Sequence, residues 1–193
     1  MLRNNDTKYG SVAIAFHWVI GLLFIGQIGL GWHMLREPDP ARQFDLFQWH
    51  KSFGFLILAL ALLRLIWTLS GTRPDDAEGL APWERLASRA AHAMLYVLMV
   101  AVPLSGWAIA SASTLQIPSY VFNLFVMPML PMAVSEAAEL LWGWVHFALA
   151  YAAAAIALAH IAAALRHHFI LHDSVLRRMM PALSRQGSKG TRP

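Results

Sequence analysis

Residues 140–165 read LLWGWVHFALAYAAAAIALAHIAAAL, a run without Asp, Glu, Lys or Arg. A helix needs about 20 predominantly apolar residues to cross a bilayer, because each residue adds only about 1.5 Å of length. This run is therefore predicted to span a membrane. It also carries His146 and His160, and an ionisable residue inside a span is costly enough to indicate a function.

Three more spans are predicted toward the N-terminus, at about residues 11–32, 49–69 and 86–110. Charged residues make up 13% of the chain, about half of the roughly 25% found in soluble domains, and hydrophobic residues make up 58%. This composition excludes a soluble globular protein, a disordered chain and, despite the basic pI, a nucleic-acid binder. We predict an all-α integral membrane four-helix bundle, a single domain over residues 1–193 that is surrounded by lipid.

Lysine and arginine are distributed unevenly over this topology. One side holds Arg36, Arg42 and Lys51. The other side holds twelve, namely Arg3, Lys8, Arg64, Arg73, Arg85, Arg89, Arg166, Arg177, Arg178, Arg185, Lys189 and Arg192. The positive-inside rule then places both termini in the cytoplasm. The connection at 111–135, whose three prolines argue against a fifth span, is external, and the basic tail at 173–193 is cytoplasmic.

Four histidines are predicted to lie within spans at two depths. His17 and His160 lie near the cytoplasmic face, and His50 and His146 lie near the external face. From His146 to His160 the chain advances 14 residues, which in a helix is about 40° less than four full turns and a rise of roughly 21 Å. Both side chains therefore lie on nearly the same face of the helix. Because the chain has no cysteine, thiolate metal sites, iron–sulfur clusters and covalent haem attachment are excluded.

This arrangement suits two stacked haems, each with two axial imidazoles. The helical neighbours of the four histidines are small, as a passing porphyrin requires, although small residues also serve plain helix packing. These neighbours are Gly21, Gly54, Gly143, Ala150, Ala157 and Ala164. The alternative without a cofactor is that the four histidines are separate core residues, each with its own hydrogen-bond partners. A zinc or copper site is less favoured, because its ligands must converge to within about 2 Å of one metal.

The remaining polar residues near these depths have weaker indications. The neighbours of His92 one helical turn away are Arg89 and Tyr96, which are too large for a porphyrin to pass. This favours a hydrogen-bonding or quinone-proximal role for His92 over ligation of haem iron. His167, one heptad after His160, could donate a hydrogen bond or a proton to a quinone.

Cations near the haems would bind their propionates, with Lys51 on the outer side and Arg64 or Arg166 on the inner side, or would simply snorkel to lipid headgroups. The other histidines, His33, His168 and His172, are predicted to be solvated or interfacial.

Several motifs resemble the prokaryotic cytochrome b-561 family of the bacterial inner membrane, over nearly the whole chain. They are YGSVAIAFHW (9–18), FQWHKSFG (47–54), WVHF (144–147), ALAHIAAALRHHF (157–169) and HDSVLRRMMP (172–181). The resemblance implies a multi-pass protein with two haem b groups, one held by His17 and His160 and the other by His50 and His146. It also supports a quinone-side role for His167. The external connection departs from the family pattern.

One family member is a superoxide oxidase that passes electrons to ubiquinone, so the resemblance implies an oxidoreductase with that reaction. Lys51 would then steer superoxide to the outer haem. A cytochrome b anchor subunit of a larger dehydrogenase or hydrogenase, which takes its electrons from a partner protein, is the alternative. A haem-free channel or assembly factor is the third hypothesis, and a colourless purified protein would select it.

Overall fold

The computed structural model describes residues 1–72, 74–75 and 79–180. It contains four long helices, α1 (Ser11–Met34), α2 (Pro40–Leu69), α3 (Pro82–Ala112) and α4 (Glu136–Phe169). A two-stranded antiparallel hairpin, β1 (Ser119–Val121) and β2 (Phe125–Met127), lies between α3 and α4, and a short 3-10 turn, η1 (Arg177–Met179), follows α4. Four of the predicted cytoplasmic cations, Arg73, Arg185, Lys189 and Arg192, and the part of the basic tail after residue 180 lie outside the described residues.

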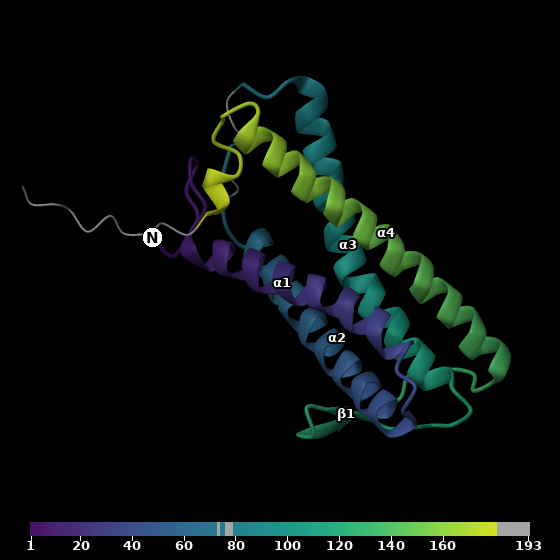
Figure 1. Cartoon of the computed structure of the whole chain (residues 1–193). Helices are drawn as coiled ribbons and strands as arrows, with labels where there is room; N and C mark the ends of the chain where they lie inside the picture. Colours follow the sequence, from purple (N-terminus) through teal and green to yellow (C-terminus); the bar gives the residue numbers. More distant parts are fainter. Residues whose placement is uncertain (73, 76–78, 181–193) are drawn as a thin grey trace, which may run out of the picture.

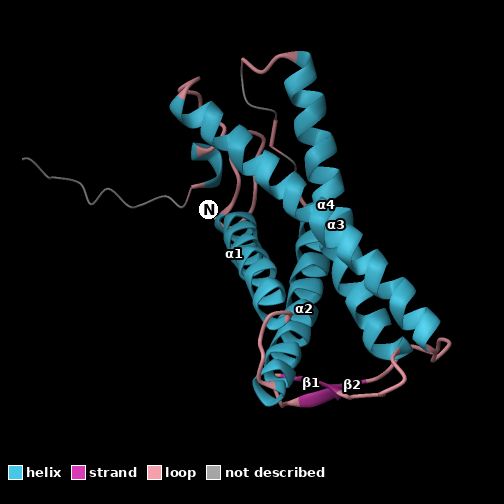
Figure 2. Ribbon diagram, turned by 45° about the vertical axis from the view of Figure 1, so that its right-hand side comes forward, coloured by secondary structure: helices cyan, strands magenta, loops and turns pink. Residues whose placement is uncertain are grey.

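The four helices form a bundle in which α3 packs along α4, α1 along α2, and α2 against α3 (Figures 1 and 2). Within the described ranges, these four helices are long and apolar enough to cross a membrane, with mean hydropathy between 1.9 and 2.1 in their most apolar windows. At most 22% of each window is buried inside the chain. So much exposed apolar surface needs lipid around it, and the predicted four-helix membrane bundle is confirmed.

Each helix contains one predicted span and extends beyond it; α2, α3 and α4 begin before their apolar runs, whereas α1 begins with its run and continues past its end. The first turns of α2 and α3 contain Pro40 and Pro82, where the missing N–H would have no helical partner anyway. Asp39 caps α2 by accepting the N–H of Arg42, and Ser135 caps α4 by accepting the N–H of Ala138.

The two ends of the bundle differ in what covers them. Residues 1–10 and 170–180 lie together at one end, which we call the terminal end, and the hairpin lies at the other, which we call the hairpin end (Figure 1). At the terminal end the indole N–H of Trp18 donates to the carbonyl of Met179, and Arg178 donates to the carbonyl of Thr7. The segment after α4 therefore folds back over the start of α1.

The hairpin is a feature that the sequence patterns did not predict. It is attached to α2 by two polar side chains that flank His50. Gln48 donates to the carbonyl of Pro118 and accepts the N–H of Tyr120, while Ser52 donates to the carbonyl of Tyr120. These bonds hold the connection across the end of α2.

Candidate cofactor site

The four span histidines form two pairs, one toward each end of the bundle. His17 of α1 and His160 of α4 have ring centroids 6.1 Å apart toward the terminal end, with the ring planes at 70°. His50 of α2 and His146 of α4 have centroids 6.3 Å apart toward the hairpin end, with the planes at 82°. Helix α4 thus supplies one imidazole to each pair.

These separations fit a metal ion held between two imidazoles. An imidazole nitrogen binds a first-row transition metal at about 2 Å, and it lies about 1 Å from its own ring centroid, so two rings on opposite sides of one metal have centroids about 6 Å apart. Direct contact between the rings would not require the same separation at both depths. The separation in each pair is therefore the one that two imidazole ligands of a single iron ion would have.

The hydrogen bonds of His146 indicate which of its nitrogens is free to bind metal. Its Nδ1 lies 3.0 Å from the carbonyl oxygen of Val102 and 3.0 Å from Oγ of Ser105, whose hydroxyl donates to the same carbonyl. A carbonyl only accepts, so Nδ1 carries the proton and Nε2 keeps its lone pair. A backbone partner of this kind is the usual way in which a metal-binding histidine is fixed in one tautomer.

Two glycines on neighbouring helices lie directly beside the rings of the hairpin-end pair. A Cβ atom at Gly106 of α3 would lie 3.3 Å from Cε1 of His146, and one at Gly31 of α1 would lie 3.2 Å from Cε1 of His50. Both glycines therefore let a histidine ring lie against a helix backbone. Sequence reasoning missed them, because it considered only helical neighbours of each histidine on its own helix.

The small neighbours that were predicted play a different part. A Cβ atom at Gly21 or Gly143 would meet no atom of the described chain within 4 Å. At Gly54 it would lie 3.6 Å from the side-chain amide of Gln27. The helix surfaces beside His17 and His146 are thus open, which is the space that a plate-shaped cofactor needs.

His92 of α3 lies against the pair at the terminal end, with its ring centroid 5.1 Å from that of His160 and the planes at 67°. Three imidazoles therefore gather there. Even so, no group of three or more His, Asp or Glu side chains within the described part of the chain is arranged to hold a metal ion.

The candidate cations differ in what they contact. The Arg64 guanidinium lies over the ring of Tyr96, 5.2 Å from its centroid, within electrostatic range of His17 and His160. Arg166 forms an ion pair with Glu84, with Nη1 3.3 Å from Oε1. Arg64 thus acts electrostatically on the histidines of the terminal-end pair, and Arg166 has a carboxylate partner.

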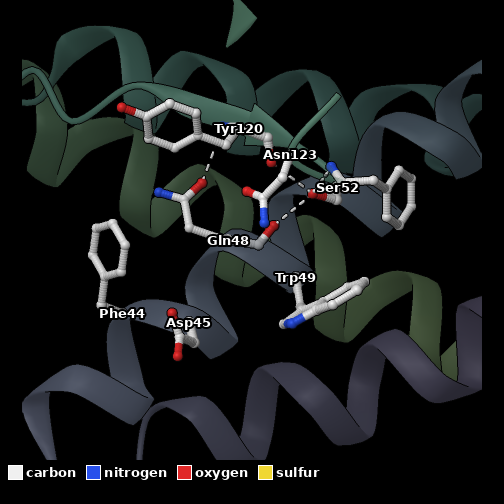
Figure 3. A pocket seen from close by; sticks show the side chains of 8 residues that line it. Phe44, Asp45, Gln48, Trp49, Ser52, Tyr120 and Asn123 are labelled. Carbon is white, nitrogen blue, oxygen red and sulfur yellow. Dashed lines mark hydrogen bonds between the residues drawn. The ribbon is translucent and has the colours of Figure 1, made fainter. Parts of the chain in front are cut away.

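Lys51 is half-buried at the hairpin end, and its Nζ lies 3.4 Å from the carbonyl oxygen of Pro118. An open pocket lies nearby, between α2 and the hairpin, lined in part by Trp49, Gln48 and Ser52 (Figure 3). The flanking neighbours of His50 thus face the connection between α3 and α4, beside an open pocket.

His167 is buried at the end of α4, where its Nδ1 is hydrogen-bonded to Oδ2 of Asp173. Burial raises the pKa of the Asp173 carboxyl, but the N–H of Val175, His167 and Arg177 together outweigh this effect and hold that pKa below its ordinary value. The carboxylate therefore stays ionised and orients the imidazole.

The structure places the other histidines away from both pairs. His33 is exposed and lies 4.0 Å from Glu37, and His172 is exposed at the terminal end. His168 is half-buried against Phe169.

Comparison with known proteins identifies the family. Residues 8–182 match the family model described as prokaryotic cytochrome b561. The chain is 32% identical to cytochrome b561 homolog 2 of Escherichia coli K12 over 92% of its own length and 93% of the relative's. It is 29% identical to the probable superoxide oxidase CybB of Yersinia pestis, over 90% and 96%, and 28% identical to cytochrome b561 homolog 1 of E. coli K12, over 90% and 97%.

The matched region includes both histidine pairs and all four membrane-spanning helices. Haem b needs no cysteine for attachment, and the nitrogen ligands that commonly hold its iron are of the kind that a histidine side chain carries. The chain belongs to the prokaryotic cytochrome b561 family, and it is a multi-pass electron-transfer protein of the bacterial inner membrane that binds haem b.

Proposed function

We propose that the protein holds two haem b groups, one between His17 and His160 and one between His50 and His146, and that it carries electrons from superoxide outside to ubiquinone at the cytoplasmic face. The main support for the proposal is that the same geometry occurs twice: the ring centroids are 6.1 Å apart in one imidazole pair and 6.3 Å apart in the other. Each pair takes one histidine from α4, and these two histidines lie roughly 21 Å apart along that helix. When bound, the haems supply one-electron transfer between the two ends. Two imidazoles on each iron leave no position for O₂, which favours outer-sphere transfer.

The orientation follows from charge. The described cations at the terminal end include Arg3, Lys8, Arg177 and Arg178, whereas Arg36, Arg42 and Lys51 lie toward the hairpin end. The positive-inside rule therefore assigns the terminal end to the cytoplasm and the hairpin end to the external side. His50 and His146 then belong to the outer haem, and His17 and His160 to the inner haem.

Arg64 would hold a propionate of the inner haem, and its positive charge acts electrostatically on His17 and His160. A nearby cation favours the reduced state of an iron centre, so this charge draws electrons toward the cytoplasmic side. Lys51, directly after His50, supplies local positive charge where superoxide arrives. The name of the Yersinia pestis relative, probable superoxide oxidase, supports superoxide as the donor.

Ubiquinone reduction consumes protons, and the terminal end offers groups that can supply them. Two superoxide anions lose one electron each and become two O₂, while one ubiquinone takes up two electrons and two protons and becomes ubiquinol. His167 lies one heptad beyond His160, and its Nδ1–H is held by the Asp173 carboxylate, so the proton that it would give to ubiquinone is the one on Nε2 of the protonated ring. We assign His167 as the proton donor to ubiquinone, and His92, close to His160, as a second group near the quinone.

The test begins with the purified protein in detergent. A pyridine haemochrome assay should give two haems per chain, and superoxide should reduce both and form ubiquinol when ubiquinone is present. One haem or none per chain overturns the two-haem proposal. Two haems that superoxide does not reduce would instead favour an anchor subunit that receives electrons from a protein partner.

Two variants separate the two ends of the reaction. His167→Ala should slow ubiquinol formation and leave haem reduction by superoxide fast. Lys51→Gln should slow haem reduction and flatten its dependence on ionic strength, because steering by charge fades with salt. Unchanged turnover in His167→Ala would place the quinone site elsewhere.

A further inference from the structure

The two histidines at the hairpin end are held in different ways. Nδ1 of His146 has the carbonyl of Val102 and the hydroxyl of Ser105 as partners. Nδ1 of His50 is buried, and among the described residues it has no hydrogen-bond partner. Buried polar atoms in folded proteins are nearly always satisfied, so this nitrogen calls for an explanation.

A second buried polar atom without a partner belongs to the residue that contacts His50. Gln27 of α1 donates from Nε2 to the carbonyl oxygen of His50, at 2.8 Å. Its Oε1 is buried, and within the described chain it too has no partner. Gly54 lies beside this contact, where a Cβ atom would be 3.6 Å from the Gln27 amide nitrogen, an ordinary van der Waals distance.

The ring of His50 turns its Nδ1 edge toward the same face of α1. A Cβ atom at Gly31 would lie 3.2 Å from Cε1 and 3.7 Å from Nδ1 of His50. Gly31 is four residues after Gln27, and residues four apart lie on one face of a helix. The unsatisfied nitrogen therefore lies beside the helix face that carries the unsatisfied amide oxygen.

The two atoms are chemically complementary. If His50 binds iron through Nε2, its Nδ1 carries a proton and must donate it, and an amide oxygen only accepts. Iron-binding histidines generally give their second N–H to such an acceptor, as His146 does to Val102. The orientation of the Gln27 amide is fixed by its bond to the His50 carbonyl, which can only accept from Nε2.

We propose that Gln27 is the positioning residue for His50: its amide oxygen accepts the Nδ1 proton of His50 across one water molecule, while its amide nitrogen donates to the carbonyl of the same residue. The inference rests on the proposed outer haem. A hydrogen bond at Nδ1 makes the imidazole a stronger donor to iron, so it stabilises the ferric state. Gln27 thus lowers the midpoint potential of the outer haem.

The experiment measures the potential of each haem in the purified protein by redox titration, together with the EPR spectrum of the ferric state. In Gln27→Leu the outer haem should lose the hydrogen bond, and its ferric-to-ferrous ratio at a fixed potential should fall about tenfold, which is a rise of about 59 mV for one electron. In Gln27→Glu the stronger acceptor should shift the ratio the other way. The inner haem should keep its potential in both variants.

Gln43→Leu is the matched control. Gln43 also links the first two helices, because its Nε2 donates to the carbonyl of Met34, and it should leave both potentials unchanged. If Gln27→Leu loses the outer haem, Gln27→Glu decides the question, because it should retain that haem at a lowered potential.

Outer-haem potentials and EPR spectra equal to the wild type in both Gln27 variants overturn the inference, and so do shifts of the same sign. A pure packing role would give shifts of the same sign in both. A wild-type protein without an outer haem would instead overturn the proposed function.

Discussion

The ring centroids of His50 and His146 lie 6.3 Å apart, and the planes of the two rings make an angle of 82°. The ring planes of His17 and His160 make a similar angle of 70°. The large angle between the ring planes in both pairs has a spectroscopic consequence. Nearly perpendicular axial imidazoles keep the two iron orbitals that they overlap close in energy. We therefore expect both ferric haems to give highly anisotropic low-spin EPR signals. Signals typical of parallel imidazoles would contradict the ring orientations.

Removal of one α4 histidine should remove one haem. His146→Ala should lose the outer haem and keep the inner one, and His160→Ala should do the reverse, because each ring belongs to a different pair. Haem per chain and low-temperature difference spectra measure the result. Retention of both haems in His160→Ala would point to His92, whose ring already lies 5.1 Å from that of His160, as a replacement ligand.

A larger residue at Gly106 should displace His146. A Cβ atom there already lies 3.3 Å from Cε1 of the ring, so Gly106→Val should turn the imidazole away from Val102 and reduce outer-haem occupancy about tenfold. Gly29→Val is the control, because a Cβ atom at that position would meet nothing of the described chain within 4 Å. Equal haem content in the two variants would show that the ring does not depend on this contact.

Loss of the Arg64 charge should make the inner haem harder to reduce. Arg64→Gln should make reduction of the inner haem less favourable by about 1 kcal/mol, which lowers the midpoint potential of that haem by roughly 43 mV for one electron. Arg64→Lys should retain most of the wild-type potential. Arg166→Gln should have a smaller effect, because Arg166 is already paired with Glu84. A redox titration that resolves the two haems measures all three variants. A larger shift at the outer haem would refute the placement of Arg64.

The Asp173 carboxylate should stabilise the segment after α4 in a pH-dependent way. Because its folded-state pKa lies below the ordinary value of 3.8, its contribution is present above that pH and is lost as the pH falls through the depressed pKa. Hydrogen exchange of residues 170–180 should therefore accelerate below pH 3.8 relative to α2. In Asp173→Asn it should already be faster at pH 7, and Asp45→Asn, at the other end, should behave as the wild type.

Hydropathy and charge determined the membrane class and the four spans from the sequence alone. Long apolar runs form helices wherever backbone groups cannot bond to water, so local composition is sufficient. The two depths of the histidines could also be predicted from the sequence, because the rise per residue of a helix converts the 14-residue spacing from His146 to His160 directly into a distance.

The contacts between helices were decided only by the tertiary structure. Gly31 lies beside His50, Gly106 beside His146 and Gln27 at the His50 carbonyl, although each is far from its partner in sequence. The periodicity of a single helix gives the face on which a residue lies, but neither the rotation of the next helix nor its height. The hairpin at residues 119–127 depends likewise on Gln48 and Ser52 of α2, and the Asp173 partner of His167 depends on a chain reversal after α4. These features arise from packing and hydrogen bonding between distant segments, which composition does not encode.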